Sequence, residues 1–380
     1  MIKASDYFDN CATTKTDDDV AKLMDYTNRE NYFNPSSLND SSVSVYNDIS
    51  AARATLINKI NGSNGDIIFT SCGSEADNLA ILGSIKNNMK LNIVTSNVEH
   101  PAVFNTINSF KSKGFEIRYA KVNKDGSVEK ESVCNLIDEN TALVSIMHVN
   151  NETGAINNIK DICKNVKAIN KNTLFMSDGV QAFTKIPVNV NELCVDLYSL
   201  SAHKIHSAKG NGALWIKRNT RINPMIYGGG QEQGIRNGTE NVAGILAFAL
   251  AAEKSMDIME SNTQHYATYK EILNTKLQKL DDYKLLCKDG SPNIYSVVFK
   301  NVKGEVIMHM LDNDDKIIVG IGSSCSSKHR TNRIAEAIEL EKSYQDGLIR
   351  ISFCKYNTIE SVEHLGDCLV KAVKSFRGIK

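Results

Sequence analysis

Residues 195–204 read Val-Asp-Leu-Tyr-Ser-Leu-Ser-Ala-His-Lys, and the interpretation of this stretch decides the fold. Its apolar start predicts a strand, which leads directly into His203 and Lys204. A lysine at the carboxyl edge of a sheet can be partly removed from water, which lowers the pKa of its amine and makes it a nucleophile. Such an amine can form a Schiff base with an aldehyde cofactor, whereas most lysines are solvated surface charges. The motifs elsewhere in the chain decide between these two interpretations.

Short apolar runs alternate with helical patterns between about residues 50 and 220. They predict strands at residues 67–70, 91–95, 115–122, 143–149 and 174–177 and helices at 76–89, 102–111, 130–137 and 160–169. Residues 143–147 are almost continuously apolar, as expected for a strand that is buried on both faces. Strands that alternate with helices predict an α/β fold with a parallel sheet and right-handed crossovers.

The pattern changes after the glycine-rich segment at residues 227–238. A long helical pattern then covers residues 241–280. Beyond it the order is mixed, with strands predicted at 293–299, 316–319 and 348–353 and helices at 306–311, 333–340 and 358–376. This order predicts a second, smaller α+β domain.

The composition limits the classes of partner. Lys+Arg and Asp+Glu each number 44 in 380 residues, so the formal charge is zero and neither nucleic acid nor an anionic membrane is a predicted partner. Residues 1–15 lack the apolar core of a signal peptide, and the longest apolar run, residues 242–252, is shorter than the roughly 20 residues of a membrane helix. We therefore expect a soluble protein.

The nine cysteines have no regular spacing and no Cys-x-x-Cys pair, which argues against a disulfide framework and against a zinc site. We expect reduced thiols in the cytoplasm and no metal centre. Cys325 differs, because it lies in the small polar segment Gly-Ser-Ser-Cys-Ser-Ser at residues 322–327. A thiol in such a segment is expected to be exposed and available as a nucleophile, and the alternative is one more free cysteine.

A turn of small residues, Thr-Ser-Cys-Gly-Ser-Glu-Ala-Asp-Asn at residues 70–78, joins the first strand of the α/β series to its helix. Ser74 and Asp77 have capping-box spacing, so we expect Ser74 to begin the helix. Unpaired N–H groups and the positive end of the helix dipole favour a phosphate site at this turn, and an ordinary capped helix is the alternative.

Polar residues also follow the neighbouring strands. His100 comes after the strand at residues 91–95, where its ring could stack on a cofactor ring or simply bond within the loop. Asn150 and Asp178 close two further strands. A buried carboxylate such as Asp178 needs a positive partner, and the protonated pyridine nitrogen of pyridoxal phosphate is one, with Gln181 near its phenolic oxygen. The alternative is that Asp178 caps the following turn.

Arg350 lies within the apolar strand predicted at residues 348–353. A buried guanidinium needs an anionic partner, and a substrate carboxylate can accept two parallel hydrogen bonds from it. The alternative is a structural ion pair with an Asp or Glu of the same domain.

Together these motifs resemble the cysteine desulfurases of iron–sulfur assembly, a branch of the class V aminotransferase family that uses pyridoxal phosphate. The resemblance runs nearly from end to end, with seven motifs in family order: Asp9-Asn10-Cys11-Ala12-Thr13-Thr14, Asn34-Pro35-Ser36-Ser37, Phe69-Thr70-Ser71, Glu99-His100, Asn150-Asn151-Glu152, Gly228-Gly229-Gly230-Gln231-Glu232 and Arg236-Asn237-Gly238-Thr239-Glu240-Asn241. It implies fold type I of the pyridoxal-phosphate-dependent transferases, with a mainly parallel seven-stranded sheet. Residues 15–255 would form the large domain, and residues 1–14 and 256–380 the small one.

The resemblance also implies a role for each matching residue. Lys204 would form the Schiff base and move the Cα proton, and Cys325 would attack the substrate sulfur and carry it as a persulfide. Arg350 would bind the substrate carboxylate, with Asn150 near that carboxylate and the phenolic oxygen of the cofactor. The other cofactor contacts would come from His100, Asp178 and Gln181 at the ring and from Gly73, Ser74, Ser201, His203 and, in the other subunit of a homodimer, Thr239 at the phosphate.

The implied reaction converts L-cysteine to L-alanine and passes sulfane sulfur to an acceptor protein for iron–sulfur cluster or thio-cofactor biosynthesis. The alternatives are a selenocysteine lyase, a class V aminotransferase and an inactive sulfur-carrier or partner subunit. The thiol at position 325 argues against an aminotransferase, because transamination does not need it. The combination of Lys204, Asp178 and Arg350 argues against an inactive subunit, which would not need these residues.

Three features depart from the family pattern. Cys11 replaces the usual alanine, and Cys-Gly-Ser at residues 72–74 replaces Gly-Ala-Thr. The segment after Arg350 is shorter than the tail with which relatives often dock a cluster scaffold, so the sulfur acceptor is left open.

Overall fold

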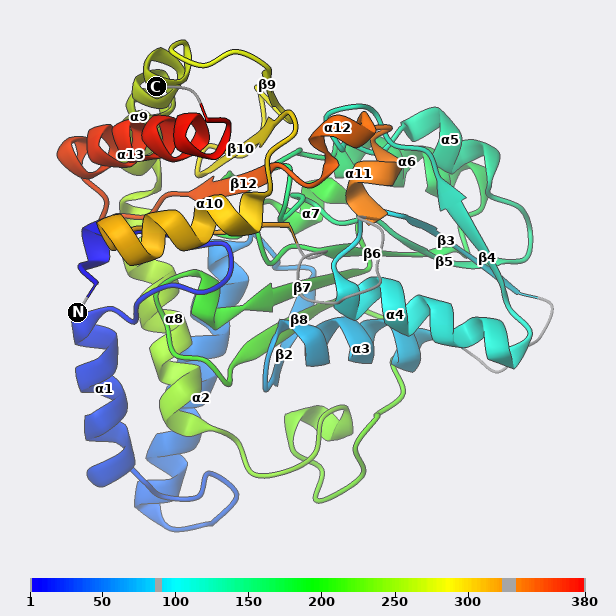
Figure 1. Cartoon of the computed structure of the whole chain (residues 1–380). Coiled ribbons are helices and arrows are strands. Elements are labelled where there is room, and N and C mark those ends of the chain that lie inside the picture. Colours follow the sequence, from blue (N-terminus) through cyan, green and yellow to red (C-terminus); the bar gives the residue numbers. More distant parts are fainter. Residues whose placement is uncertain (1, 86–90, 323–332, 379–380) are drawn as a thin grey trace.

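The computed structural model describes residues 2–85, 91–322 and 333–378 of the chain. Its central sheet contains β2 (Gly65–Thr70), β3 (Asn92–Ser96), β4 (Glu116–Ala120), β5 (Thr141–Ser145), β6 (Leu174–Asp178), β7 (Leu197–Ser201) and β8 (Gly212–Lys217). The strand order is β2-β8-β7-β6-β5-β3-β4 (Figure 1). β3 to β7 are parallel, whereas β8 is antiparallel to both β2 and β7. The prediction of a mainly parallel seven-stranded sheet is confirmed.

The strands of this sheet have apolar side chains on both faces because helices cover both faces. One face packs against α2 (Asp40–Lys59), α6 (Ile159–Ile169) and α8 (Val242–Asp257), and the other packs against α3 (Gly73–Ser84) and α4 (Pro101–Ser109). Ile67 belongs to the apolar cluster that includes α2 and α8, while the next residue, Ile68, belongs to the cluster that includes α3 and α4. Each strand therefore needs a continuous apolar run rather than an alternating one.

A smaller antiparallel sheet lies in the C-terminal part of the chain (Figure 1). It consists of β9 (Tyr283–Leu285), β10 (Ile294–Phe299) and β12 (Leu348–Ser352) and packs with α9 (Met259–Leu277), α10 (Gly304–Met310) and α13 (Ile359–Phe376). The short strand β1 (Tyr7–Phe8) pairs in parallel with β11 (Ile318–Val319). Phe8 is buried in the apolar cluster of this smaller sheet, whereas Cys11 is buried in the cluster of the large sheet. The boundaries after residues 14 and 255 remain a prediction.

The long helical pattern at residues 241–280 forms two helices rather than one. Ile258 leaves the helical conformation between α8 and α9, with φ −107° and ψ 5°. Phe248 of α8 packs in the apolar core of the large sheet, whereas Tyr269 of α9 packs in that of the smaller sheet. The break therefore lies where the chain passes from one apolar core to the other.

The remaining helices are α1, which lies beside α8, and a set of short segments on the connections. They are α1 (Asp18–Arg29), α5 (Lys130–Asn135), α7 (Val190–Leu193), α11 (Arg333–Ala337), α12 (Lys342–Gln345), η1 (Ala4–Asp6), η2 (Phe110–Lys113), η3 (Ala202–Lys204), η4 (Glu232–Gly234) and η5 (Leu311–Asp315). In the described part of the chain, no helix combines the length and the apolar character that a membrane crossing requires.

Candidate active site

A cavity of about 350 Å³ lies where the carboxyl ends of β6 and β7 meet the N-terminus of α3. Nine of the predicted site residues line it: Gly73, Ser74, His100, Asp178, Gln181, Ser201, His203, Lys204 and Arg350. The cavity is also lined by residues that were not predicted as site residues: Cys11, Ala12, Cys72, Asp77, Met147, Asn151 and Val180. This is the edge of a parallel α/β sheet at which ligands bind.

Lys204 ends the short turn η3, which follows β7 directly. Its Nζ donates hydrogen bonds to the backbone carbonyls of Cys11 at 2.5 Å and Ala12 at 2.8 Å. Gln181 Nε2 donates to the same Cys11 carbonyl at 3.1 Å. Burial lowers the pKa of the Lys204 amine, which increases the fraction of free amine available as a nucleophile.

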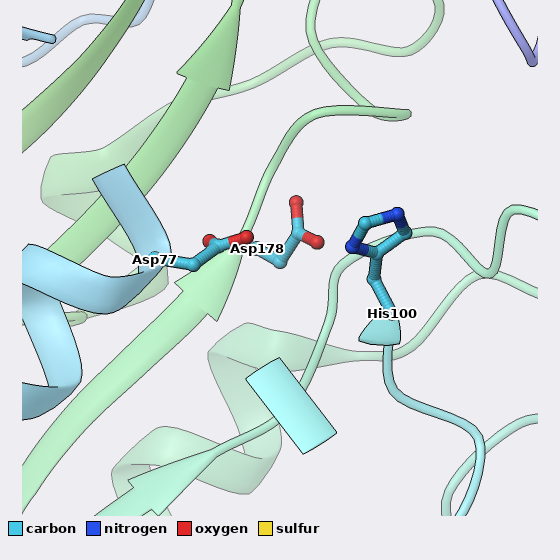
Figure 2. A group of neighbouring side chains, drawn as sticks. All are labelled: Asp77, His100 and Asp178. Atoms are coloured by element: carbon cyan, nitrogen blue, oxygen red, sulfur yellow. The ribbon is translucent and has the colours of Figure 1, made fainter. Parts of the chain in front are cut away.

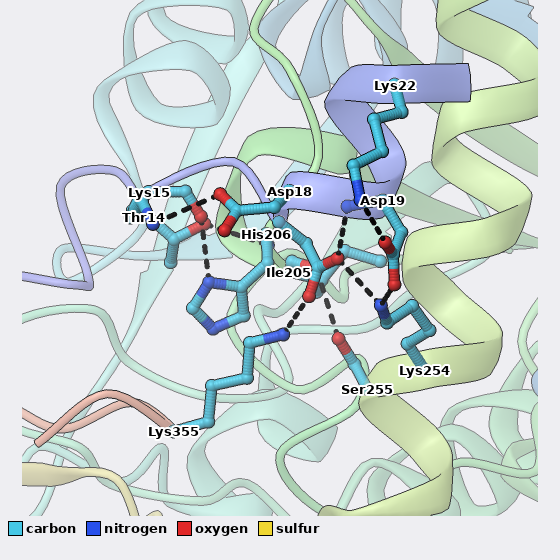
Figure 3. Close-up of polar contacts among 11 residues, drawn as sticks. Thr14, Lys15, Asp18, Asp19, Lys22, Ile205, His206, Lys254, Ser255 and Lys355 are labelled. Carbon is cyan, nitrogen blue, oxygen red and sulfur yellow. Dashed lines mark hydrogen bonds and ion pairs between the residues drawn. The ribbon is translucent and has the colours of Figure 1, made fainter. Parts of the chain in front are cut away.

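The N-terminal segment that accepts these bonds runs along the turn after Lys204 (Figure 3). Thr14 donates to the carbonyl of His203 from its N–H at 3.0 Å and from its Oγ1 at 2.8 Å, and the N–H of His206 donates back to Thr14 Oγ1 at 2.8 Å. His203 Nδ1 lies 3.1 Å from Thr13 Oγ1. Burial, followed by the nearby Lys204, lowers the pKa of His203 to about 4, so its imidazole is neutral at neutral pH.

Asp17 anchors the other end of this segment. Its carboxylate accepts hydrogen bonds from Lys254 of α8 at 2.7 Å and from Lys355, which follows β12. Burial would raise the pKa of the Asp17 carboxyl, but the bonds from the two lysines outweigh it and hold this pKa well below its usual value. These ion pairs join the N-terminal segment to helices and strands of both sheets (Figure 3).

The N-terminus of α3 provides the expected anion-binding geometry, but the cap of the helix lies two residues earlier than expected. Its N-cap is Cys72, whose Sγ accepts from the N–H of Glu75 at 3.4 Å, so the prediction that Ser74 caps the helix is wrong. A Cβ on Gly73 would lie 3.0 Å from Val180 Cγ2 and 3.1 Å from Ser201 Cβ, so the helix approaches β7 closely. The buried Ser201 Oγ has no hydrogen-bond partner among the described residues.

Asp77, His100 and Asp178 form a cluster on one side of the cavity, with Asp178 between the other two (Figure 2). Oxygen and nitrogen atoms of the three side chains lie within 4.8 Å of one another. His100 Nδ1 accepts from the N–H of Ala102 at 3.2 Å, and burial lowers the pKa of its imidazole, so the ring is neutral with its proton on Nε2. Burial raises the pKa of both carboxyls.

Asp178 caps a turn and also faces the cavity, so the two roles expected for it do not exclude each other. Its Oδ1 accepts from the N–H of Val180 at 2.9 Å, so it caps the turn after β6. It also lines the cavity beside the neutral ring of His100. A cationic ring nitrogen in the cavity would give this buried carboxylate the positive partner that it needs.

The two asparagines that follow β5 behave differently. Asn150 does not line the cavity, because its Oδ1 accepts from the N–H groups of Glu152 at 2.9 Å and Thr153 at 2.8 Å and its Nδ2 donates to the carbonyl of Val98 at 3.0 Å. Asn151 does line it, and its buried Oδ1 has no partner in the described part of the chain. Asn150 was expected at the cofactor and the substrate carboxylate, but Asn151 is the asparagine that lines the cavity, because the amide of Asn150 is used by the turn itself.

Arg350 is buried on β12 and also reaches the cavity. Its Nη2 donates to Asp9 Oδ1 at 2.7 Å and its Nη1 donates to the carbonyl of Asn151 at 2.8 Å. Its Nε has no acceptor among the described residues. The ion pair that was the structural alternative therefore exists, and the Nε–H group is left without a described acceptor.

One further predicted residue does not line the cavity, and another is not described. Thr239 is exposed between η4 and α8 and does not line the cavity of its own chain. Cys325 lies outside the described residues.

Comparison with known proteins places these observations in a family. The aminotransferase class-V family model matches residues 6–365. The cysteine desulfurase of Nostoc sp. (strain PCC 7120) is 35% identical over 379 residues, which covers 98% of this chain and 94% of that protein. A solved NifS-like protein has a TM-score of 0.90 and 34% identity, with 100% of each chain covered. The solved complex of SspA with cysteine has a TM-score of 0.80 and 28% identity, and covers 93% of this chain and 100% of that chain.

Both the family model and the curated relative match almost the whole chain, and the relative is more than 30% identical to it. The chain therefore belongs to the aminotransferase class-V family and, within it, to the cysteine desulfurases.

Proposed function

We propose that this protein is an L-cysteine desulfurase that uses pyridoxal phosphate, converts L-cysteine to L-alanine and leaves the sulfur on Cys325. The observation that carries this proposal is the convergence of Lys204, Asp178 and Arg350 on one cavity, in a chain that matches cysteine desulfurases over 98% of its length. The sulfur then passes to an acceptor protein for iron–sulfur cluster or thio-cofactor biosynthesis.

The cavity has the donors that pyridoxal phosphate requires. The first turn of α3 at Gly73 and Ser74, the unpartnered hydroxyl of Ser201 and the side chain of His203 would hold the phosphate. His100 would stack on the ring, Asp178 would pair with the ring nitrogen and Gln181 would contact the phenolic oxygen. When bound, the cofactor supplies an aldehyde for amines and an electron sink for a carbanion.

The substrate carboxylate would bind to Arg350, because the Nε–H group of this residue has no acceptor among the described residues. Asn151 lines the same cavity, and its Nδ2 would donate to the carboxylate, while Asn150 would act by folding the turn that carries Asn151. Lys204 would then take the proton from the substrate Cα. Its lowered pKa favours the free amine that this step needs.

Sulfur transfer would take place between two thiols. The thiolate of Cys325 attacks the substrate sulfur, so that a sulfur–sulfur bond forms and the bond between that sulfur and the substrate Cβ breaks. The electron pair of the broken bond remains with the substrate carbon, which takes up a proton and leaves as alanine. One enzyme thiol and one L-cysteine thus give one persulfide and one L-alanine.

We propose a homodimer in which each subunit completes the other's site. Leu38, Tyr227 and Tyr32 are 96%, 83% and 68% exposed, and such large apolar side chains are often covered in an assembly. Thr239 directly follows the glycine-rich segment at residues 227–238, which begins with Tyr227, and is itself exposed. A twofold axis would cover this surface and bring Thr239 to the partner's phosphate site.

We also propose a cytoplasmic location. All eight cysteines in the described ranges are free thiols, and six of them belong to neither the cavity lining nor any proposed step. Free thiols in this number are typical of proteins in a reducing compartment.

The test of the proposed function is the visible spectrum of the purified protein with and without L-cysteine, combined with assays of alanine and sulfide. Bound pyridoxal phosphate, a spectral change with L-cysteine, and equal amounts of alanine and sulfide in the presence of a thiol reductant are expected. A keto acid as product would indicate transamination. Turnover of L-selenocysteine but not of L-cysteine would indicate a selenocysteine lyase.

A further inference from the structure

Asp77 lines the cavity but has no part in the reaction proposed above. It lies in the first half of α3 and is only 1% exposed. Ser199 Oγ of β7 donates to its Oδ1 at 2.6 Å. Asp178 and His100 are also close to it, because a side-chain oxygen or ring nitrogen of each of the three residues lies within 4.8 Å of those of the other two (Figure 2).

Two buried carboxylates at this separation cannot both be charged without a large electrostatic cost, because little water screens their repulsion. One proton therefore remains on the pair. The two members differ in their surroundings, and this difference decides which of them keeps the proton.

Asp178 has the surroundings that favour charge. The N–H of Val180 donates to its Oδ1 at 2.9 Å, and the ring nitrogen of the bound cofactor would give it a cationic partner. Asp77 has no such support. The hydroxyl of Ser199 is the hydrogen-bond donor described for it, and the carboxyls of Asp178 and Glu99 and the thiol of Cys72 also face it. The neutral ring of His100 lies near both members of the pair and does not distinguish them.

We propose that Asp77 is a positioning residue that keeps the proton of the Asp77–Asp178 pair, so that Asp178 carries the single negative charge and presents it to the cofactor ring. The inference rests on the proposed function for the identity of the ring. Since Ser199 donates to Oδ1, the acid hydrogen of Asp77 belongs on Oδ2. A charged Asp77 would repel the charge on Asp178 and favour its protonation, and a protonated Asp178 could no longer pair with the ring nitrogen. A neutral Asp77 removes this repulsion.

The test compares Asp77→Asn, Asp77→Leu and Asp178→Asn in the full-length protein. Asparagine imitates a protonated aspartic acid and can still accept the hydrogen bond of Ser199. We expect the Kd for pyridoxal phosphate in Asp77→Asn to stay within about threefold of the wild-type value. Asp178→Asn removes the charge and is expected to raise this Kd by about tenfold or more, which corresponds to roughly 1.4 kcal/mol. Asp77→Leu leaves Ser199 without an acceptor and is expected to raise it by about tenfold as well.

A second readout does not depend on the cofactor. The infrared carbonyl band of a buried protonated carboxyl should be present at neutral pH in the wild-type protein and in Asp178→Asn, and should be lost in Asp77→Asn. A Glu99→Gln variant identifies the band of Glu99, whose carboxyl is also buried and whose pKa is raised to about 8 by burial. The difference between the wild-type and Asp77→Asn spectra isolates Asp77.

Two results would overturn the inference: an Asp77→Asn variant that loses cofactor affinity as severely as Asp178→Asn, or a wild-type spectrum without the Asp77 band. An unchanged Kd in a folded Asp77→Leu variant would also overturn the positioning role, because it would show that the hydrogen bond from Ser199 to Asp77 does not help to place the pair. The proposed function fails separately, when the wild-type protein binds pyridoxal phosphate but forms no alanine from L-cysteine.

Discussion

The side-chain amine of Lys204 donates a hydrogen bond of 2.5 Å to the backbone carbonyl of Cys11, a residue 193 positions earlier in the chain. The bond ties the end of β7 to the N-terminal segment, which itself pairs with β11 through β1. Because the acceptor is a backbone carbonyl, an alanine at position 11 would preserve it. This explains how the chain can carry a cysteine where the family usually has alanine.

Lys204→Ala is expected to abolish the covalent link between the protein and its cofactor. Borohydride should fix pyridoxal phosphate to the wild-type protein but not to this variant, because only an amine can form the link. Lys185→Ala is the matched control: Lys185 is another buried lysine, its pKa is lowered to about 8 by burial, and it does not line the cavity. Cofactor that is still fixed to the Lys204→Ala protein would rule out the role of Lys204.

Arg350→Ala is expected to lower kcat/KM for L-cysteine by about tenfold or more. A charge-assisted bond to a carboxylate is commonly worth about 1.5–3 kcal/mol, and about 1.4 kcal/mol corresponds to a factor of ten. Arg29→Ala, which removes an exposed arginine paired with Asp25, should leave the value unchanged. If steady-state kinetics give the same kcat/KM for Arg350→Ala and the wild type, the carboxylate is held elsewhere.

Asp17→Asn is expected to destabilise the fold by about 2 kcal/mol at neutral pH, because it removes bonds between a buried carboxylate and two lysines. The folded-state pKa of Asp17 lies below its unfolded value of about 3.8. The ion pairs of Asp17 therefore contribute their full share to the free energy of unfolding above the unfolded pKa. This contribution is lost as the pH falls toward the folded pKa.

The free energy of unfolding, measured by urea denaturation at a series of pH values, checks this expectation. The difference between the wild type and Asp17→Asn should be constant near neutral pH and should shrink below about pH 4. Asp18→Asn is the control, because its side chain is 79% exposed and such ion pairs contribute little. A difference that grows as the pH falls would contradict the role given to Asp17.

The shared dimer site can be tested by mixing two defective subunits. Thr239→Val should weaken cofactor retention without changing the unfolding midpoint, and Lys204→Ala should be inactive. A mixed dimer should contain one site with both Lys204 and the partner's Thr239, so activity should return when the subunits exchange. An active monomer in sedimentation, or no recovery after verified exchange, would remove the shared-site model.

The main architecture could be predicted from the sequence because buried parallel strands need continuous apolar runs. The site could be predicted in part because polar residues at the carboxyl ends of such strands meet at one edge of the sheet. Lys204, Asp178 and His100 were found in this way. Arg350 was found because an arginine inside an apolar strand needs an anion.

Other features depended on packing that no local pattern records. The break at Ile258 arises because α8 and α9 belong to different apolar cores. The choice between Asn150 and Asn151 depends on which amide the turn uses for its own N–H groups. Asp77 was read only as a capping residue, since its proximity to Asp178 comes from the contact between α3 and the sheet.

The most direct test of the central claim is a single turnover of the enzyme with one equivalent of L-cysteine per subunit and no reductant, followed by alkylation, digestion and mass spectrometry. The account predicts one L-alanine per subunit and one additional sulfur atom on the peptide that contains Cys325. In Cys325→Ser, the visible spectrum should still change with L-cysteine, while neither the added sulfur nor the alanine appears. Alanine formed at the wild-type rate in Cys325→Ser, or the added sulfur on another cysteine such as Cys72, would contradict the account.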